Sequence, residues 1–168
     1  MQLTHYNSKF KQQQFPVTVV CQNVSNAPNI GSLFRACDAF GIEKLIFCGT
    51  DIPLGRKMTK TSRATEKSVN YEMHKSALEV VNKLKENNYF ILSLEISTNS
   101  QALNKVKFNP NQPIALIIGD ENFGVSEEVL KISDAIVHIN MFGQNSSMNV
   151  VQATSITLYE ITKQFSLK

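Results

Sequence analysis

A strand–helix–strand pattern within residues 17–48 constrains the fold more than any other feature of the sequence. Val17 to Cys21 is an unbroken, mostly β-branched run, which is typical of a strand buried on both faces. Lys44 to Cys48 is a second apolar run. Between them, apolar residues recur at helical spacing at Ile30, Leu33, Phe34 and Cys37. Gly41 is placed to end this helix, so the pattern predicts a βαβ unit and a parallel sheet.

The rest of the chain continues the alternation of strands and helices. Ser76 and Glu79 form a capping box at the start of a helix. Three further strands are expected at Tyr89–Leu94, Ile114–Ile118 and Ala135–Ile139. Ser126 is expected to cap a short helix, and the last helix is expected over 148–164. We predict an α/β fold with a mostly parallel sheet of five or six strands and helices on both faces.

Composition narrows the class of protein. The 168 residues are 42% hydrophobic and 18% charged, which suits one globular domain over 16–168 after a tail or short helix over 1–15. No apolar run approaches the ~20 residues of a membrane span, and the polar N-terminus lacks a signal-peptide core, so we expect a cytoplasmic protein. The three cysteines lack metal-ligand spacing and are expected to be buried and reduced, and no metal site is predicted. The net charge of +3 permits an RNA partner.

One long segment, residues 49–71, has no clear period and is expected to be a loop. It carries a set of basic residues, Arg56, Lys57, Lys60, Arg63 and Lys67. They form either a solvated loop or a surface that contacts RNA phosphates, and the sequence leaves both interpretations open.

Polar residues follow two of the expected strands. Gly119, Glu121 and Gly124 come after the fourth strand, and Ser147 and Asn149 precede the last helix. The carboxyl ends of parallel strands are where α/β sheets bind ligands. Each group also has a purely structural interpretation, a turn in the first case and a helix N-cap in the second.

Three motifs together resemble one known family. They are N-A-P-N-I-G-S-L-F-R from Asn26, I-I-G-D-E-N-F-G from Ile117 and I-N-M-F-G-Q-N-S-S-M-N-V from Ile139. In this order and spacing they resemble the motifs of the SpoU/TrmH-type RNA 2′-O-ribose methyltransferases of the SPOUT superfamily. The resemblance covers residues 17–163. It implies a C-terminal trefoil knot, a homodimer formed through the last helix, and S-adenosylmethionine (SAM) as cofactor.

The resemblance also implies which residues form the site. The catalytic positions would be Asn29, Arg35, Glu121, Ser147 and Asn149. The SAM contacts would come from the backbone of Leu94, Gly119, Ile139, Met141 and Met148. Arg35 would activate the ribose 2′-hydroxyl. Because a guanidinium is a poor base, either Arg35 is unusually perturbed or it polarises the hydroxyl while another group takes the proton.

Asp120 departs from the family pattern, where this position is often Asn, and adds a carboxylate. Some relatives have RNA-binding extensions that this chain lacks, so RNA is expected to contact the domain itself through the basic residues of 49–71. The expected substrate is tRNA rather than rRNA, and the segment from Lys60 to Lys67 resembles a loop of relatives that modify a D-loop guanosine. The alternatives are an rRNA methyltransferase and a non-catalytic RNA-binding protein on the same fold. A Rossmann dehydrogenase is disfavoured because G-x-G-x-x-G is absent.

Overall fold

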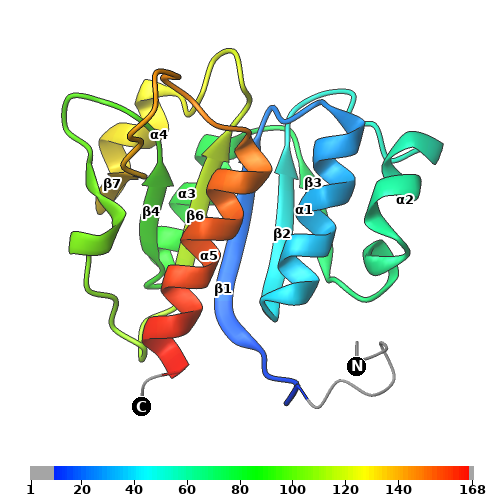
Figure 1. Cartoon of the computed structure of the whole chain (residues 1–168), viewed down its shortest axis with the longest axis horizontal. Helices are drawn as coiled ribbons and strands as arrows, with labels where there is room; N and C mark the ends of the chain where they lie inside the picture. Colours follow the sequence, from blue (N-terminus) through cyan, green and yellow to red (C-terminus); the bar gives the residue numbers. More distant parts are fainter. Residues whose placement is uncertain (1–9, 167–168) are drawn as a thin grey trace.

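Seven parallel strands form the sheet, in the order β3-β2-β1-β6-β4-β7-β5 (Figure 1). The computed structural model describes residues 10–166. The strands are β1 (Phe15–Gln22), β2 (Ile42–Cys48), β3 (Tyr71–His74), β4 (Phe90–Leu94), β5 (Gln101–Ala102), β6 (Ile114–Gly119) and β7 (Ala135–His138). The predicted parallel α/β sheet is confirmed. Since every strand runs the same way, the carboxyl ends of β4, β6 and β7 lie at the same end of the sheet.

Helices cover both faces of the sheet, as predicted. They are α1 (Ala27–Ala39), α2 (Arg56–Ser62), α3 (Ala77–Glu86), α4 (Glu127–Ile132) and α5 (Val150–Ser166), with 3-10 turns η1 (Thr65–Lys67) and η2 (Leu103–Lys105). The core cluster on one face contains residues of α1, α2 and α5, and the cluster on the other contains residues of α3 and α4. Figure 1 shows α1 and α5 side by side in front of the sheet.

The strand count of five or six was wrong, because two short edge strands extend the sheet. β3 pairs with β2 over Tyr71–His74, and β5 pairs with β7 over only Gln101–Ala102. Edge strands are half-exposed, so they lack the continuous apolar run that marks a central strand. Residues 10–14 have no regular structure and β1 begins at Phe15, while the rest of the tail or short helix expected over 1–15, residues 1–9, lies outside the described part of the chain.

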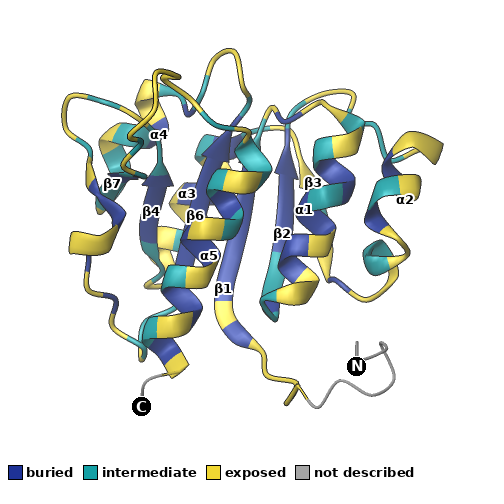
Figure 2. Cartoon of the chain, viewed as in Figure 1, coloured by how far each residue is buried: buried dark blue, intermediate teal, exposed yellow. Residues whose placement is uncertain are grey.

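β1 lies at the centre of the fold, and its sequence explains why. Val19 and Cys21 face the α1–α5 layer, whereas Val20 faces the α3–α4 layer. All three are fully buried, as the dark strand in Figure 2 shows. A strand that is apolar on both faces needs a layer packed on each, and β1, which lies between β2 and β6 in the sheet, has the α1–α5 layer on one face and the α3–α4 layer on the other.

Residues 49–71 are not the long loop that we expected. They contain α2 and η1, and α2 packs on α1 where Gly31 lies against the backbone of Met58 and Ser62. A Cβ at Gly31 would overlap the Met58 carbonyl oxygen. The helix has only seven residues, of which Met58 and Ser62 are buried, so it is too short to show an apolar period.

The three cysteines are free and buried, as predicted. Burial raises the pKa of Cys48 to about 12 and, with Asp38 nearby, that of Cys37 to about 12. Their thiols therefore stay protonated at neutral pH. Among residues 10–166, no helix is long and apolar enough to cross a membrane, and no cluster of three His, Cys, Asp or Glu side chains could hold a metal ion.

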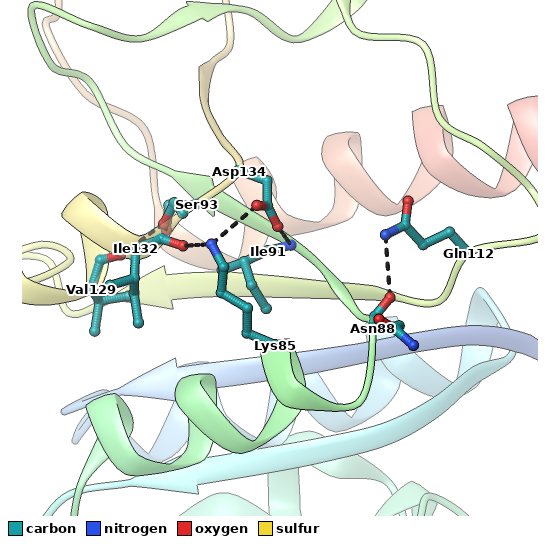
Figure 3. Close-up of polar contacts among 9 residues, drawn as sticks. Lys85, Asn88, Ile91, Ser93, Gln112, Val129, Ile132 and Asp134 are labelled. Carbon is teal, nitrogen blue, oxygen red and sulfur yellow. Dashed lines mark hydrogen bonds and ion pairs between the residues drawn. The ribbon is translucent and has the colours of Figure 1, made fainter.

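Asp134 directly precedes β7 and joins the amino end of this strand to β4 and α3 (Figure 3). Its carboxylate accepts a hydrogen bond from the backbone N–H of Ile91 in β4 at 2.8 Å and contacts Lys85 Nζ of α3 at 3.1 Å. The Lys85 ammonium also donates to the Ile132 carbonyl at 2.5 Å. This network fixes the register of β7 on β4, and β7 leads directly into a loop of the site.

Replacing Asp134 with Ala is expected to lower the free energy of unfolding by about 1–3 kcal/mol, because the N–H of fully buried Ile91 loses its side-chain acceptor. The measurement is a denaturant titration. The control is Lys131→Ala, which removes half of a mostly exposed ion pair with Glu127 and should change stability by less than about 0.5 kcal/mol. Equal stability losses in the two variants would contradict this role.

Candidate active site

A cavity of about 770 Å³ opens at the carboxyl ends of β4, β6 and β7. Its walls come from three segments, 94–96 after β4, 118–125 around the end of β6, and parts of 138–153 between β7 and the first turns of α5. Figure 1 shows the loops after β6 and β7 at the same end of the sheet. This volume lies within the ~300–1,000 Å³ of small-molecule sites in proteins.

All five residues that the sequence motifs assign to SAM line this cavity. They are Leu94, Gly119, Ile139, Met141 and Met148. Each follows or ends a strand or precedes α5, so its backbone is available at the edge of the sheet. The five residues come from all three segments that form the cavity, which supports their proposed contact with the cofactor.

The loop after β6 depends on two glycines. A Cβ at Gly119 would overlap the backbone of Gly124 and the backbone nitrogen of Val125. Gly124 has φ +63°, and a Cβ there would overlap the Glu95 carboxylate. The loop can therefore fold back tightly only with glycine at both ends.

Asp120, which departs from the family pattern, has a structural role in the same loop. Its Oδ1 accepts backbone hydrogen bonds from Asn122 at 3.0 Å and Phe123 at 2.7 Å. The backbone N–H of Gly124 donates to the Asp120 carbonyl at 3.0 Å and closes the turn. An Asx turn of this kind suits Asp as well as Asn, so the substitution preserves the loop.

Glu95 is a residue of the site that the sequence analysis missed. Its two carboxylate oxygens accept hydrogen bonds from the backbone N–H groups of Ile96 at 2.8 Å and Val125 at 2.9 Å. It therefore ties the end of β4 to the loop after β6, and it lines the cavity. The available signal was a carboxylate directly after a buried strand, but its partner Val125 lies 30 positions further along.

The three motifs meet in one chain of hydrogen bonds at the cavity. The Asn149 amide donates to Asn29 Oδ1 at 3.2 Å, and the Asn29 amide donates to Glu121 Oε1 in a short contact. The backbone of Asn29 is itself held by Asn26, whose side chain caps α1 at 3.1 Å. The folded chain therefore brings together Asn29, Glu121 and Asn149, three of the five residues that the resemblance assigns to catalysis.

Asn149 fits both interpretations that the sequence left open. Its Oδ1 accepts the backbone N–H of Val151 at 2.9 Å, so it caps α5, while its amide reaches Asn29. The helix begins at Val150 rather than at the predicted 148. Ser147 is exposed and lines the cavity two residues earlier.

Two predicted groups lie away from this cavity. Arg35 is exposed on α1, six residues after Asn29, and is not among the cavity-lining residues. Six residues correspond to about 9 Å along a helix and about 240° around it, so Arg35 leaves α1 in a different direction from Asn29. The basic residues Arg56, Lys57, Lys60, Arg63 and Lys67 are all exposed on α2, its C-cap and η1, on the far side of α1 from α5 (Figure 1).

The charge of the cavity wall fits SAM. Glu95, Asp120 and Glu121 line it, and no Lys or Arg of residues 10–166 does. A wall of this sign favours a cationic sulfonium, while Ile118, Met141 and the strand-end backbone offer apolar and hydrogen-bonding surface to the rest of the cofactor.

Comparison with known proteins agrees with this geometry. The model of the SpoU rRNA methylase family matches residues 16–159. The tRNA (guanosine(18)-2′-O)-methyltransferase of Thermus thermophilus is 29% identical over 156 residues, which cover 92% of this chain and 78% of that protein. The corresponding enzyme of Aquifex aeolicus is 28% identical, over 92% of this chain and 72% of that protein.

Solved structures show the same similarity. The TrmH/SpoU tRNA modifying enzyme of A. aeolicus superposes with a TM-score of 0.83 at 28% identity, over 92% of this chain and 78% of that chain. The methyltransferase AviRb of Streptomyces viridochromogenes, in complex with SAM, gives 0.79 at 25% identity, over 92% and 62%.

This chain belongs to the SpoU rRNA methylase family. Members of the family are SAM-dependent 2′-O-methyltransferases that act on tRNA or rRNA. The resemblance read from the three motifs is thereby confirmed, and with it SAM as the cofactor and RNA as the class of substrate.

Proposed function

We propose that this protein transfers a methyl group from SAM to a ribose 2′-hydroxyl of tRNA, at a D-loop guanosine. The observation that carries the proposal is the Asn149–Asn29–Glu121 chain of hydrogen bonds beside a cavity of suitable size and charge. The named activity of the Thermus and Aquifex relatives supports the choice of tRNA. A tRNA substrate also agrees with the cytoplasmic location expected from the sequence.

SAM supplies the methyl group, and the protein's own residues position the acceptor. Asn29 holds one carboxylate oxygen of Glu121, so the carboxylate keeps a fixed orientation at the cavity. In our proposal its other oxygen accepts a hydrogen bond from the ribose. Ser147 and Asn149 line the same cavity and supply further polar contacts. Positioning of this kind provides a large part of the rate gain in transfers between two bound reactants.

Arg35 takes part in this proposal through a homodimer. Because it leaves α1 away from its own cavity, the activating role implied by the motif would be exercised in the cavity of a second subunit. The exposed side of α5 supports such a partner. Ile156 and Tyr159 are 43% and 59% exposed there, and Ile156 borders a shallow apolar hollow with Met148 and Val151. A helix with apolar residues on two sides favours packing against two partners.

We further propose that the chain has the C-terminal trefoil knot of the SPOUT superfamily. The strand order supports it, because β6 lies between β1 and β4 although it follows both in sequence. The loops after β6 and β7 border one cavity with α5, which is the neighbourhood where such a crossing would occur.

The test is transfer of labelled methyl groups from SAM into unfractionated tRNA and into rRNA, followed by nuclease digestion. Label in 2′-O-methylguanosine from the tRNA D-loop is expected. Label found only in rRNA would replace the tRNA proposal, and SAM binding without transfer to either pool would favour the non-catalytic alternative. The Glu121→Gln variant provides the control for background methylation.

The basic surface of α2 and η1 is expected to contact RNA phosphates. Replacing Lys60 and Arg63 with Ala should weaken tRNA binding and reduce the slope of log affinity against log salt by about 1 to 2, because two phosphate contacts are lost. The matched control replaces Lys83 and Lys131, which are exposed on α3 and α4 at the opposite face of the sheet. A slope unchanged in the first variant would show that this surface does not bind RNA.

A further inference from the structure

Two phenylalanines are almost fully exposed on the loops that follow β6 and β7. Phe123 is 87% exposed in the loop after β6, and Phe142 is 97% exposed in the loop after β7. Phe123 lines the cavity, and Phe142 directly follows the cavity-lining Met141. Phe34 and Phe47, by contrast, are completely buried in the core. Two large apolar rings held in water on adjacent loops are not explained by the packing of the fold.

The proposed reaction brings a nucleobase to these rings. The acceptor ribose must enter the cavity mouth near Glu121, which is two residues before Phe123 in the same loop. The base is attached directly to that ribose, so it lies at the rim. Bases in single-stranded loops of RNA are splayed out and bound by stacking on aromatic side chains.

The charge of the rim favours the base over the phosphate backbone. Asp120 and Glu121 line the mouth, and carboxylates disfavour phosphates at close range. An uncharged ring can stack on a neutral base beside them without this repulsion. Phosphates farther along the RNA, beyond the acceptor nucleotide, would be held by the basic surface of α2 and η1, on the far side of α1 (Figure 1).

We infer that Phe123 and Phe142 form a stacking platform that holds an unpaired nucleobase of the acceptor RNA at the cavity mouth. This inference rests on the proposed function, because it assigns the rings to the same acceptor. The platform is sequence-tolerant, since every base offers a π face. The platform orients the nucleotide, whereas contacts at other positions determine which base is accepted.

The test compares Phe123→Ala, Phe142→Ala and the double variant with the wild-type protein in methyl transfer to unfractionated tRNA. Each single change is expected to lower kcat/KM for tRNA by about tenfold, as for loss of one stacked base. The SAM affinity of Phe142→Ala should stay within about twofold, because Phe142 does not line the cavity. The salt slope of tRNA binding should not change in any of the variants, because no phosphate contact is lost. Phe142→Tyr, which keeps the ring, should restore most of the activity.

Phe10→Ala is the matched control. Phe10 is 89% exposed, but it precedes the amino end of β1, whereas the cavity lies at the carboxyl ends of the parallel strands, so its loss should leave kcat/KM unchanged. Wild-type-like activity in the double variant would overturn the inference. A changed oligomeric state in sedimentation would also overturn it, because the rings would then belong to a protein interface.

Failure of the proposed function would be recognised separately. If the wild-type protein transfers no methyl group to RNA, the proposed function is wrong. The stacking platform is then decided by tRNA binding alone, in which the double variant should bind about tenfold or more weakly than wild type at every salt concentration. Equal binding by the two proteins would overturn the inference.

Discussion

Arg35→Ala is expected to lower methyl transfer by a factor of about 100 or more while leaving SAM affinity within about twofold. The rate loss has the size of a lost acid–base or polarising group, which contributes roughly 10²–10⁴. SAM affinity is retained because Arg35 does not line the cavity of its own chain and its proposed contact in the second subunit is with the ribose hydroxyl rather than with SAM. The measurements are single-turnover methylation of tRNA and calorimetric SAM binding. Arg35→Lys keeps the charge but loses the planar fork, so it should recover only part of the rate.

The homodimer proposal makes a sharper version of this prediction. Arg35→Ala and Glu121→Gln are each expected to be inactive as homodimers. Random pairing of the two chains makes half of the dimers mixed, and each mixed dimer would contain one intact cavity if Arg35 acts across the interface. Co-expression of the two variants should then recover about a quarter of the wild-type activity.

Different outcomes would assign Arg35 differently. No recovery in mixed dimers would mean that Arg35 serves the cavity of its own chain. Wild-type turnover in the Arg35→Ala variant would show that Arg35 has no role in the reaction in either subunit. Parallel loss of SAM binding would instead show that Arg35 supports the cofactor site.

Gly119→Ala is expected to weaken SAM binding by about 100-fold or more and to destabilise the fold. The added Cβ would overlap the backbone of Gly124 and the nitrogen of Val125. Those atoms belong to the main chain, so no side-chain rotation can relieve the contact, and the loop that forms a cavity wall must move. Overpacking of a buried position costs about 1–3 kcal/mol in stability. SAM affinity by calorimetry and a thermal unfolding curve measure the two effects.

Gly143→Ala is the matched control for this change. Gly143 lies in the loop after β7, and a Cβ there meets no atom within 4 Å. SAM affinity and stability should therefore remain near those of the wild type. If Gly119→Ala also bound SAM normally, the loop after β6 would not form part of the cofactor site.

Local sequence rules predicted the elements whose signals are contained within one segment. Val17 to Cys21 became the buried part of β1, and Gly41 follows α1 with φ +61°. The Ser76 side chain caps α3 by accepting the N–H of Glu79 at 3.3 Å. Each of these features depends on neighbours within a few residues, so a pattern in the sequence was sufficient to find it.

The features that were missed depend on distant partners. α2 is a helix because it packs on Gly31 of α1, and Glu95 belongs to the site because Val125 returns to it. Residues that join the site across 92 and 120 positions, Asn29 with Glu121 and Asn29 with Asn149, were assigned by resemblance to a family. Neither hydrophobic period nor turn chemistry carries information over that separation.

Asn149 makes the assembly of the site part of the folding of the last helix. The same side chain satisfies the N–H of Val151 in the first turn of α5 and contacts Asn29 in α1. When that turn frays, Glu121 loses the support of the chain of amides that holds it. A ligand that binds only when these side chains are assembled also stabilises the first turn of α5. Its binding should therefore slow hydrogen exchange of the backbone amides at the start of α5.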